Sequence, residues 1–154
     1  MKAMRTKTKQ NQIPAISLDP ADCNCLAIRQ AARQVTQFYD RHLGVIGLRT
    51  SQYSILSKLL RLGPQSINAL AMLMAMDRTT TGRAIRPLER DGLIEVAAGD
   101  DARTRVMQLT GAGRARLKEA QPLWREAQRD FETRYGGGEA ASLREALSRV
   151  VSLH

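Results

Sequence analysis

The residues of this sequence with the clearest chemical potential lie between positions 79 and 86. Four of them share one face of a predicted helix at the spacing i, i+3, i+4, i+7: Thr79, Gly82, Arg83 and Arg86. Arginine carries a planar fork of N–H donors that suits guanine edges and phosphate oxygens. The spacing therefore predicts a helix face that enters a groove of double-stranded DNA. The alternative is a solvated face whose arginines pair with Glu89 or Asp91.

A predicted β-hairpin follows this helix and carries a second group of charged residues. Residues 93–96 and 104–109 alternate apolar and polar side chains around a turn at 99–103. Arg103 in the turn has the length and charge to enter a minor groove, and Arg105 follows it on the second strand. Asp101 has two interpretations: it orients Arg103 through a charge-assisted hydrogen bond, or it is an ordinary turn aspartate.

Helical periodicity predicts the elements that must position these residues. The helices expected from apolar spacing span 22–43, 50–62, 66–74, 77–91, 110–135 and 140–151. The residues expected to cap them are Asp19 or Asp22, Thr50, Ser66, Asp77 and Thr110. In the helix 77–91, Thr81, Ile85 and Leu88 fall on the core side, away from the arginines. Two short helices joined by a tight turn and followed by a hairpin are typical of a winged helix-turn-helix. The predicted fold class is mainly α with a small β-hairpin wing.

Composition favours a nucleic-acid partner and disfavours an enzyme. The 154 residues contain 24 Lys and Arg against 15 Asp and Glu, a net charge of +9 that suits a polyanion. Residues 1–20 are expected to form a disordered basic arm. No run is long and apolar enough for a membrane span and no signal core is present, so we expect no membrane association and a cytoplasmic location. With two cysteines and two histidines, neither a metal site, a cofactor nor an acid/base constellation is predicted.

Two segments resemble a known family. The stretches MDRTTTGRAIRPLERDGLIEV and GDDARTRVMQLTGAG look like the recognition helix, wing and following helix of the MarR family of bacterial transcription regulators. The resemblance implies an obligate homodimer, with dimerisation helices at 21–48 and 110–154 and a DNA-binding region at 49–109. It also implies a repressor that binds a pseudo-palindromic operator and is released by a small ligand. The alternative from another class is a basic architectural nucleic-acid-binding module without a ligand.

The resemblance assigns roles to individual residues. Thr79, Gly82, Arg83 and Arg86 match the groove-facing positions of the family, and Arg103 matches its wing-tip arginine. Ser66 and Thr80 are expected to serve phosphates at helix N-termini. Thr81 stands where the family usually has an aliphatic residue, and Gly82 replaces a side chain that commonly contacts bases. The family's sequence preference therefore does not carry over.

A small ligand or a thiol is the expected regulatory input. Family members frequently bind phenolic and aromatic acids, and the residues proposed here as pocket or redox candidates are Cys25, Arg29, Phe38, Tyr39, His42 and Tyr53. Cys25 and Tyr39 are similar in placement to the reactive cysteine and a tyrosine partner of the peroxide-sensing OhrR branch, whereas Arg29 departs from that pattern. The other interpretation of Cys25 is a packing or pocket-lining residue. Cys23 is expected not to pair with Cys25, because the two point to different helix faces.

Overall fold

The structure is a computed structural model that describes residues 19–101 and 103–152. Most of the predicted basic arm, residues 1–18, lies outside the described part. The chain divides into two units, residues 1–33 and 34–154, and each is described by itself. This boundary falls inside the predicted dimerisation segment 21–48, whose role stays a prediction.

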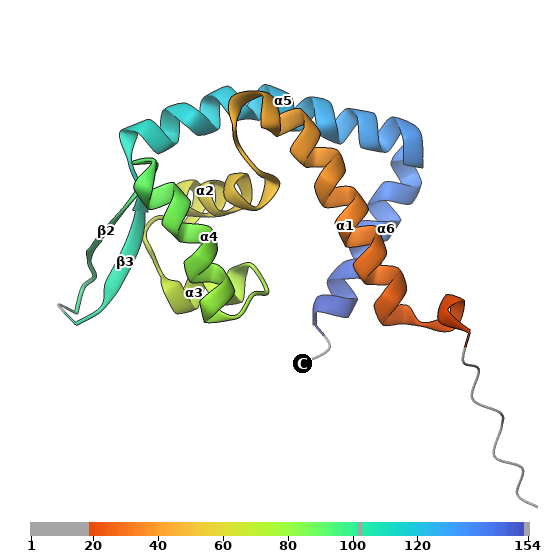
Figure 1. The fold of residues 1–154 in the computed structure, drawn as a ribbon, viewed down its shortest axis with the longest axis horizontal. Helices are drawn as coiled ribbons and strands as arrows, with labels where there is room; N and C mark the ends of the chain where they lie inside the picture. Colours follow the sequence, from red (N-terminus) through yellow and green to blue (C-terminus); the bar gives the residue numbers. More distant parts are fainter. Residues whose placement is uncertain (1–18, 102, 153–154) are drawn as a thin grey trace, which may run out of the picture. The chain divides into compact units, whose positions relative to one another are not determined.

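The architecture is mainly helical with one small sheet, as predicted (Figure 1). The α-helices are α1 (Asn24–Leu43), α2 (Thr50–Leu62), α3 (Ile67–Leu73), α4 (Arg78–Arg90), α5 (Gly111–Tyr135) and α6 (Gly137–Val151). The strands are β1 (Gln65–Ser66), β2 (Ile94–Ala98) and β3 (Arg105–Leu109), and short 3-10 helices span Pro20–Asp22 and Gly44–Ile46. In the described residues no helix has the length and apolar character needed to cross a membrane.

Three of the predicted helix caps are confirmed. A side-chain oxygen accepts a backbone N–H from three residues further on in each case: Ser66 Oγ from Ala69 at 3.1 Å, Asp77 Oδ1 from Thr80 at 2.8 Å, and Thr110 Oγ1 from Gly113 at 3.0 Å. These contacts satisfy N–H groups that have no partner inside the helix. They fix where α3, α4 and α5 begin.

The prediction that Thr50 caps α2 is wrong. Thr50 is the first helical residue, and Arg49 occupies the cap position with an extended backbone. The Thr50 N–H donates instead to Asp40 Oδ1 at 2.7 Å, so a carboxylate from α1 satisfies the start of α2. The Thr50 hydroxyl is buried and has no hydrogen-bond partner in the described part of the chain.

The predicted cap of α1 is also wrong. Cys23 precedes the helix, and its sulfur accepts the N–H of Leu26 at 3.4 Å. Asp19 caps the short 3-10 helix by accepting the N–H of Ala21 at 2.9 Å, and Asp22 is the last residue of that helix. The 3-10 helix Pro20–Asp22 lies between Asp19 and α1, and Cys23 separates Asp22 from α1, so neither aspartate is at the cap position of α1.

The sheet contains one strand more than the sequence predicts. All pairings are antiparallel in the order β1-β3-β2, with Ile94 opposite Leu109 in the hairpin and Ser66 opposite Val106 at the added strand. β1 has two residues, too few for an alternating pattern to be recognised. It ties the residue before α3 to the wing.

The core of residues 34–154 lies among α2, α3, α4, the sheet and the first half of α5. Its largest fully buried side chains are Leu43, Ile55, Leu56, Leu70, Leu88, Ile94 and Thr81. Within this unit α5 runs alongside α2, and the β2–β3 hairpin extends away from the helices (Figure 1). The core therefore holds α4 and the hairpin in a fixed relation.

Candidate nucleic-acid interface

Helix α4 has the two faces that its sequence predicts. Thr81, Ile85 and Leu88 are 0%, 5% and 0% exposed, so the core side is confirmed. Thr81 is a polar residue in this apolar setting, and its hydroxyl donates to the Asp77 carbonyl at 2.8 Å. A buried hydroxyl with a partner avoids the cost of an unsatisfied polar group.

The opposite face of α4 is open. Thr79, Arg83 and Arg86 are exposed. In the described part of the chain neither arginine lies within ion-pairing distance of a carboxylate, and Asp91 pairs instead with Arg90 at 3.1 Å. The guanidinium groups are thus available to an external anion or base edge.

Gly82, the remaining residue of this face, is half-buried. A Cβ added there would lie 3.7 Å from Ile67 Cδ1, an ordinary van der Waals distance. Packing within the chain therefore does not require glycine at this position.

The carboxylate of Asp77, the cap residue of α4, places a negative charge at the N-terminus of this helix. Thr80 donates its hydroxyl to Asp77 Oδ2 at 2.6 Å and its backbone N–H to Oδ1. The hydroxyl hydrogen bond is the largest cause that holds the pKa of Asp77 below its ordinary value, and the backbone hydrogen bond adds to it. The hydroxyls of Thr80 and Ser66 both serve as parts of helix caps, and their contact with phosphates stays a prediction.

Arg78 and Asn68 form a contact that sequence reasoning missed. Arg78 is the first residue of α4, and its Nη1 donates to Asn68 Oδ1 at 3.0 Å from the first turn of α3. Both side chains are exposed. The signal that could have identified Arg78 is its position, because the N-terminal residues of the second helix in a helix-turn-helix contact base edges.

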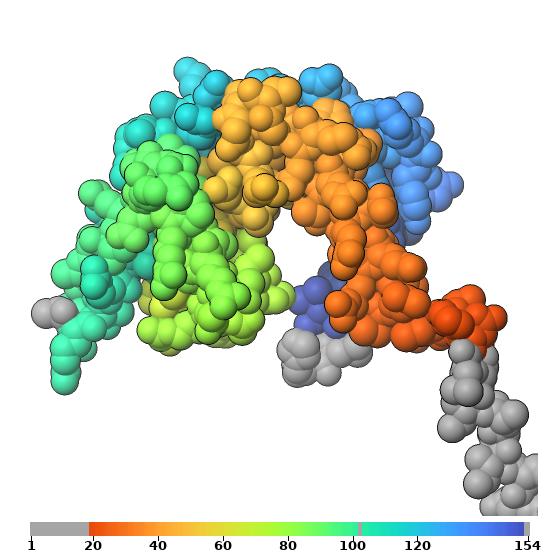
Figure 2. Space-filling model, in the orientation of Figure 1, coloured from red at the N-terminus to blue at the C-terminus, as the bar shows by residue number. Residues whose placement is uncertain are grey.

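The wing turn is organised by Asp101. Its Oδ1 accepts the backbone N–H of Arg103 at 3.0 Å and lies 3.6 Å from Arg103 Nε, while its carbonyl accepts the N–H of Thr104 at 2.7 Å. The turn closes where the Gly99 N–H donates to the Thr104 carbonyl at 2.7 Å. The Arg103 side chain is 92% exposed, and the hairpin tip projects from the body of the unit (Figure 2). Arg105, also exposed, begins β3 opposite Ala98.

The root of the wing is locked to α5. The Thr110 hydroxyl donates to the Gly92 carbonyl at 2.7 Å, and the Thr110 N–H donates to the Leu93 carbonyl at 3.2 Å. A Cβ added to Gly113 would lie 2.0 Å from that same Leu93 oxygen. Only glycine permits this approach of α5 to the wing.

Of the aromatic pocket candidates predicted from sequence, Phe38 contacts Tyr39 and His42, whereas Tyr53 lies apart from them. Tyr53 stacks on Trp124 at 5.8 Å between ring centroids and lines a pocket of about 340 Å³ between α2 and α5. The pocket is lined by Tyr53, Ser57, Leu60, Arg61, Arg114, Leu117, Lys118 and Gln121. Among the described residues that line this pocket, three have cationic side chains and none has a carboxylate. This chemistry suits an anionic ligand.

Phe38, Tyr39 and His42 lie elsewhere, where the second half of α1 packs on α5. Phe38 contacts Phe131 edge to face at 6.1 Å, and His42 Nε2 lies 3.8 Å from Asp130 Oδ2. These residues do not line the pocket of Tyr53, but Phe38 lines a separate pocket of about 290 Å³ and Tyr39 one of about 320 Å³.

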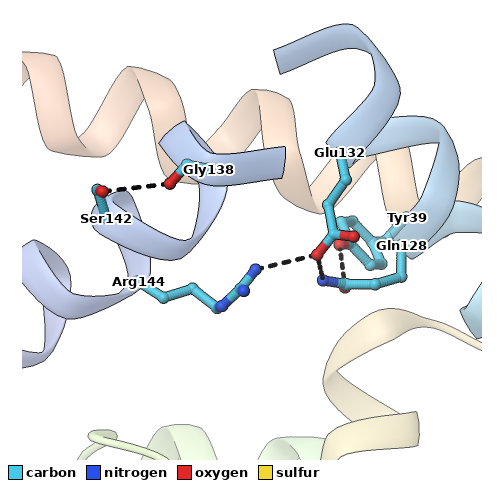
Figure 3. Close-up of polar contacts among 6 residues, drawn as sticks. All are labelled: Tyr39, Gln128, Glu132, Gly138, Ser142 and Arg144. Atoms are coloured by element: carbon cyan, nitrogen blue, oxygen red, sulfur yellow. Dashed lines mark hydrogen bonds and ion pairs between the residues drawn. The ribbon is translucent and has the colours of Figure 1, made fainter. Parts of the chain in front are cut away.

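Tyr39 belongs to a polar chain that joins α1, α5 and α6 (Figure 3). Its hydroxyl donates to Gln128 Oε1 at 2.6 Å, and Gln128 Nε2 donates to Glu132 Oε1 at 3.0 Å. Arg144 Nη1 donates to the same Glu132 oxygen at 3.2 Å. Burial, with a smaller effect of the Glu132 charge, raises the pKa of Tyr39. Its hydroxyl is therefore a hydrogen-bond donor at neutral pH.

Cys25 and Arg29 lie in the other unit, residues 1–33, and both are exposed. The thiols of Cys23 and Cys25 are free, and it is the Cys23 sulfur that accepts a backbone hydrogen bond. Oxidation at Cys25 stays a prediction. Among residues 19–101 and 103–152 there is no cluster of three or more His, Cys, Asp and Glu side chains that could hold a metal ion.

Known proteins resemble this chain in sequence and in fold. A model described as the MarR family matches residues 48–104. The uncharacterized HTH-type transcriptional regulator YwoH of Bacillus subtilis (strain 168) is 28% identical over 92 residues, which cover 60% of this chain and 67% of the relative. A probable transcriptional regulator from Pseudomonas aeruginosa has 32% identity and a TM-score of 0.75, with 84% of this chain and 98% of that chain covered. The M. tuberculosis transcriptional regulator MosR, solved in complex with DNA, has 36% identity and a TM-score of 0.69, with 84% and 98% covered. With its recognition helix and wing formed as described, this chain belongs to the MarR family of DNA-binding transcriptional regulators.

Proposed function

We propose that the protein is a homodimeric repressor that binds a pseudo-palindromic operator and is released by a small anionic ligand. The observation that carries the DNA-binding part is the division of α4 into a buried face and an open face. Arg83 and Arg86 on the open face have no carboxylate partner in the described part of the chain. α4 enters the major groove, and Arg103 at the projecting wing enters the adjacent minor groove.

Exposed apolar side chains on α1 and α6 support the dimer. Leu26 and Ile28 on α1 are 38% and 39% exposed, and Leu147, Val150 and Val151 on α6 are 41%, 39% and 59% exposed. Apolar surface of this kind favours association with a second subunit. A two-fold dimer presents two α4 helices, so its operator consists of two half-sites about one helical turn apart, roughly 34 Å.

The pocket between α2 and α5 supports the ligand. Arg61, Arg114 and Lys118 supply positive charge at its wall, and Tyr53 supplies an aromatic face. An aromatic carboxylate matches both features, because its ring stacks on Tyr53 while its carboxylate pairs with a guanidinium. α2 packs against α4 and β3, and Thr110 at the start of α5 is hydrogen-bonded to the root of the wing, so a ligand that separates α2 from α5 alters the placement of α4.

The test is selection of preferred DNA sequences from a random library by the full-length protein, followed by affinity measurements at physiological salt. We expect a palindromic site that is preferred over random DNA by several kcal/mol. Arg83→Ala should cost about 1 to 3 kcal/mol and relax specificity at one position. Arg103→Ala should weaken binding because it removes a minor-groove cation.

The control is Arg125→Ala, which removes the same charge from an exposed position of α5. Its affinity for the selected site should stay close to that of the unsubstituted protein. Steep salt dependence without any sequence preference would contradict the repressor and indicate a basic architectural protein.

A further inference from the structure

We propose that Arg78 recognises a guanine in the major groove and that Asn68 holds its guanidinium in position. The proposal rests on the function proposed above, and it adds a specificity-determining residue and its positioning partner to that interface. The contact that carries it is the hydrogen bond of 3.0 Å from Arg78 Nη1 to Asn68 Oδ1, which crosses from α4 to α3.

The direction of this hydrogen bond is set by chemistry. A guanidinium only donates, so the Asn68 atom that faces it must be the amide oxygen. Asn68 uses one N–H of Arg78, and among residues 19–101 and 103–152 the guanidinium makes no other hydrogen bond. In the described part of the chain Arg78 makes no ion pair with a carboxylate. The side chain is therefore tethered at one nitrogen and open to a ligand at the rest of its fork.

A tethered arginine fork suits a base edge. Guanine presents O6 and N7 side by side in the major groove, and arginine contacts both at once. A flexible arginine loses side-chain entropy when it is fixed in that geometry, and the contact with Asn68 removes part of this loss before DNA binds. Arg78 is also the first residue of α4, the end of a recognition helix that contacts bases.

The neighbouring charge argues against a phosphate as the partner of Arg78. Asp77 directly precedes Arg78 and is exposed, and the hydrogen bonds from Thr80 that lower the pKa of its carboxyl favour the ionised form. A carboxylate at this place repels a phosphate, whereas a guanine edge carries no net charge. The same end of α4 is thus better suited to a base than to the DNA backbone.

The experiment measures affinity of the full-length protein for the selected operator and for its single base-pair variants, at several salt concentrations. Arg78→Ala should weaken binding to the operator about 5- to 150-fold and abolish the preference for one G·C pair in each half-site. Arg78→Lys retains the charge but lacks the fork, and it should lose the same preference. Asn68→Ala should weaken operator binding by about 2- to 10-fold and have little further effect in an Arg78→Ala background.

Arg90→Ala is the matched control, because Arg90 is exposed in the last turn of the same helix and pairs with Asp91. It should leave the base preference unchanged.

If the Arg78→Ala variant lost affinity equally for all sequences, with a salt slope lower by about one, that result would identify a phosphate contact and overturn the proposal. Independent effects of Asn68→Ala and Arg78→Ala would overturn the positioning role. An unsubstituted protein without sequence preference would overturn the proposed function and the guanine contact together, whereas loss of selectivity in Arg83→Ala but not in Arg78→Ala would refute the guanine contact alone.

Discussion

Replacing Gly113 by alanine tests how the wing is attached to the rest of the DNA-binding region. Gly113 lies in the first turn of α5 and is buried. An added Cβ would lie 2.0 Å from the Leu93 carbonyl oxygen and 2.7 Å from Leu109 Cδ1. The Leu93 oxygen is a backbone atom that accepts a hydrogen bond from Thr110, so it cannot move aside without breaking that contact.

The size of the effect follows from three contributions. Overpacking of this kind costs about 1 to 3 kcal/mol. Loss of the hydrogen bond to Leu93 costs about 0.5 to 1.5 kcal/mol. Alanine recovers about 1 kcal/mol of helix propensity relative to glycine. We therefore expect Gly113→Ala to lower the free energy of unfolding by about 0.5 to 3.5 kcal/mol.

Gly111→Ala is the matched control in the same helical turn. Apart from the adjacent residues and the backbone of α5 itself, no atom of the described residues lies within 4 Å of a Cβ added at Gly111, so only the propensity gain applies there. Urea unfolding of both variants at one fixed protein concentration, with m-values compared, measures the difference, since the stability of a dimer depends on concentration. Equal unfolding midpoints for the two variants would refute the close approach of α5 to Leu93.

Three further substitutions test local features by the same unfolding assay. Ala75 has a φ of 50° between α3 and α4, so Ala75→Gly should raise the free energy of unfolding by about 0.5 to 1 kcal/mol, and a decrease would contradict the strain. Thr50→Val removes a buried hydroxyl that has no hydrogen-bond partner among the described residues, so stability should stay equal or rise by about 1 kcal/mol; a loss of similar size would reveal a partner for that hydroxyl. The lowered pKa of Asp77 means that its carboxylate stabilises the fold above the ordinary value of 3.8 and that this contribution is lost as pH falls through the lower folded value. Asp77→Asn should therefore lose less stability than the unsubstituted protein between pH 6 and pH 2, and identical pH profiles would show that the Thr80 hydrogen bonds do not stabilise the ionised form.

Sequence reasoning worked best where the signal is local. The spacing of Thr81, Ile85 and Leu88 decides which side of α4 is buried, whatever the neighbouring elements are. Ser66 and Asp77 cap helices through contacts that span three residues, and such contacts are visible in the sequence. Asp101 and Arg103 interact across two residues, so the turn geometry was also within reach.

Sequence reasoning failed where an atom finds its partner in another element. The N–H of Thr50 is satisfied by Asp40, and this changes where α2 begins. The Ser66 strand pairs with Val106, 40 residues away, and two residues show no periodicity of their own. The aromatic candidates separate because Tyr53 faces the pocket between α2 and α5, while Phe38 packs on Phe131.

The sequence alone determined the order of the elements, the two faces of α4 and the charge that suits DNA, because helix period, capping and net charge depend on residue type and spacing. The tertiary structure alone decided that Asn68 meets Arg78 and that α5 approaches the Leu93 carbonyl at Gly113. Both contacts depend on the angle and distance at which two elements pack, and these are set by the whole core. The interface was therefore predictable as a surface, but the residue that we propose to recognise a base became apparent only from the packing of α3 against α4.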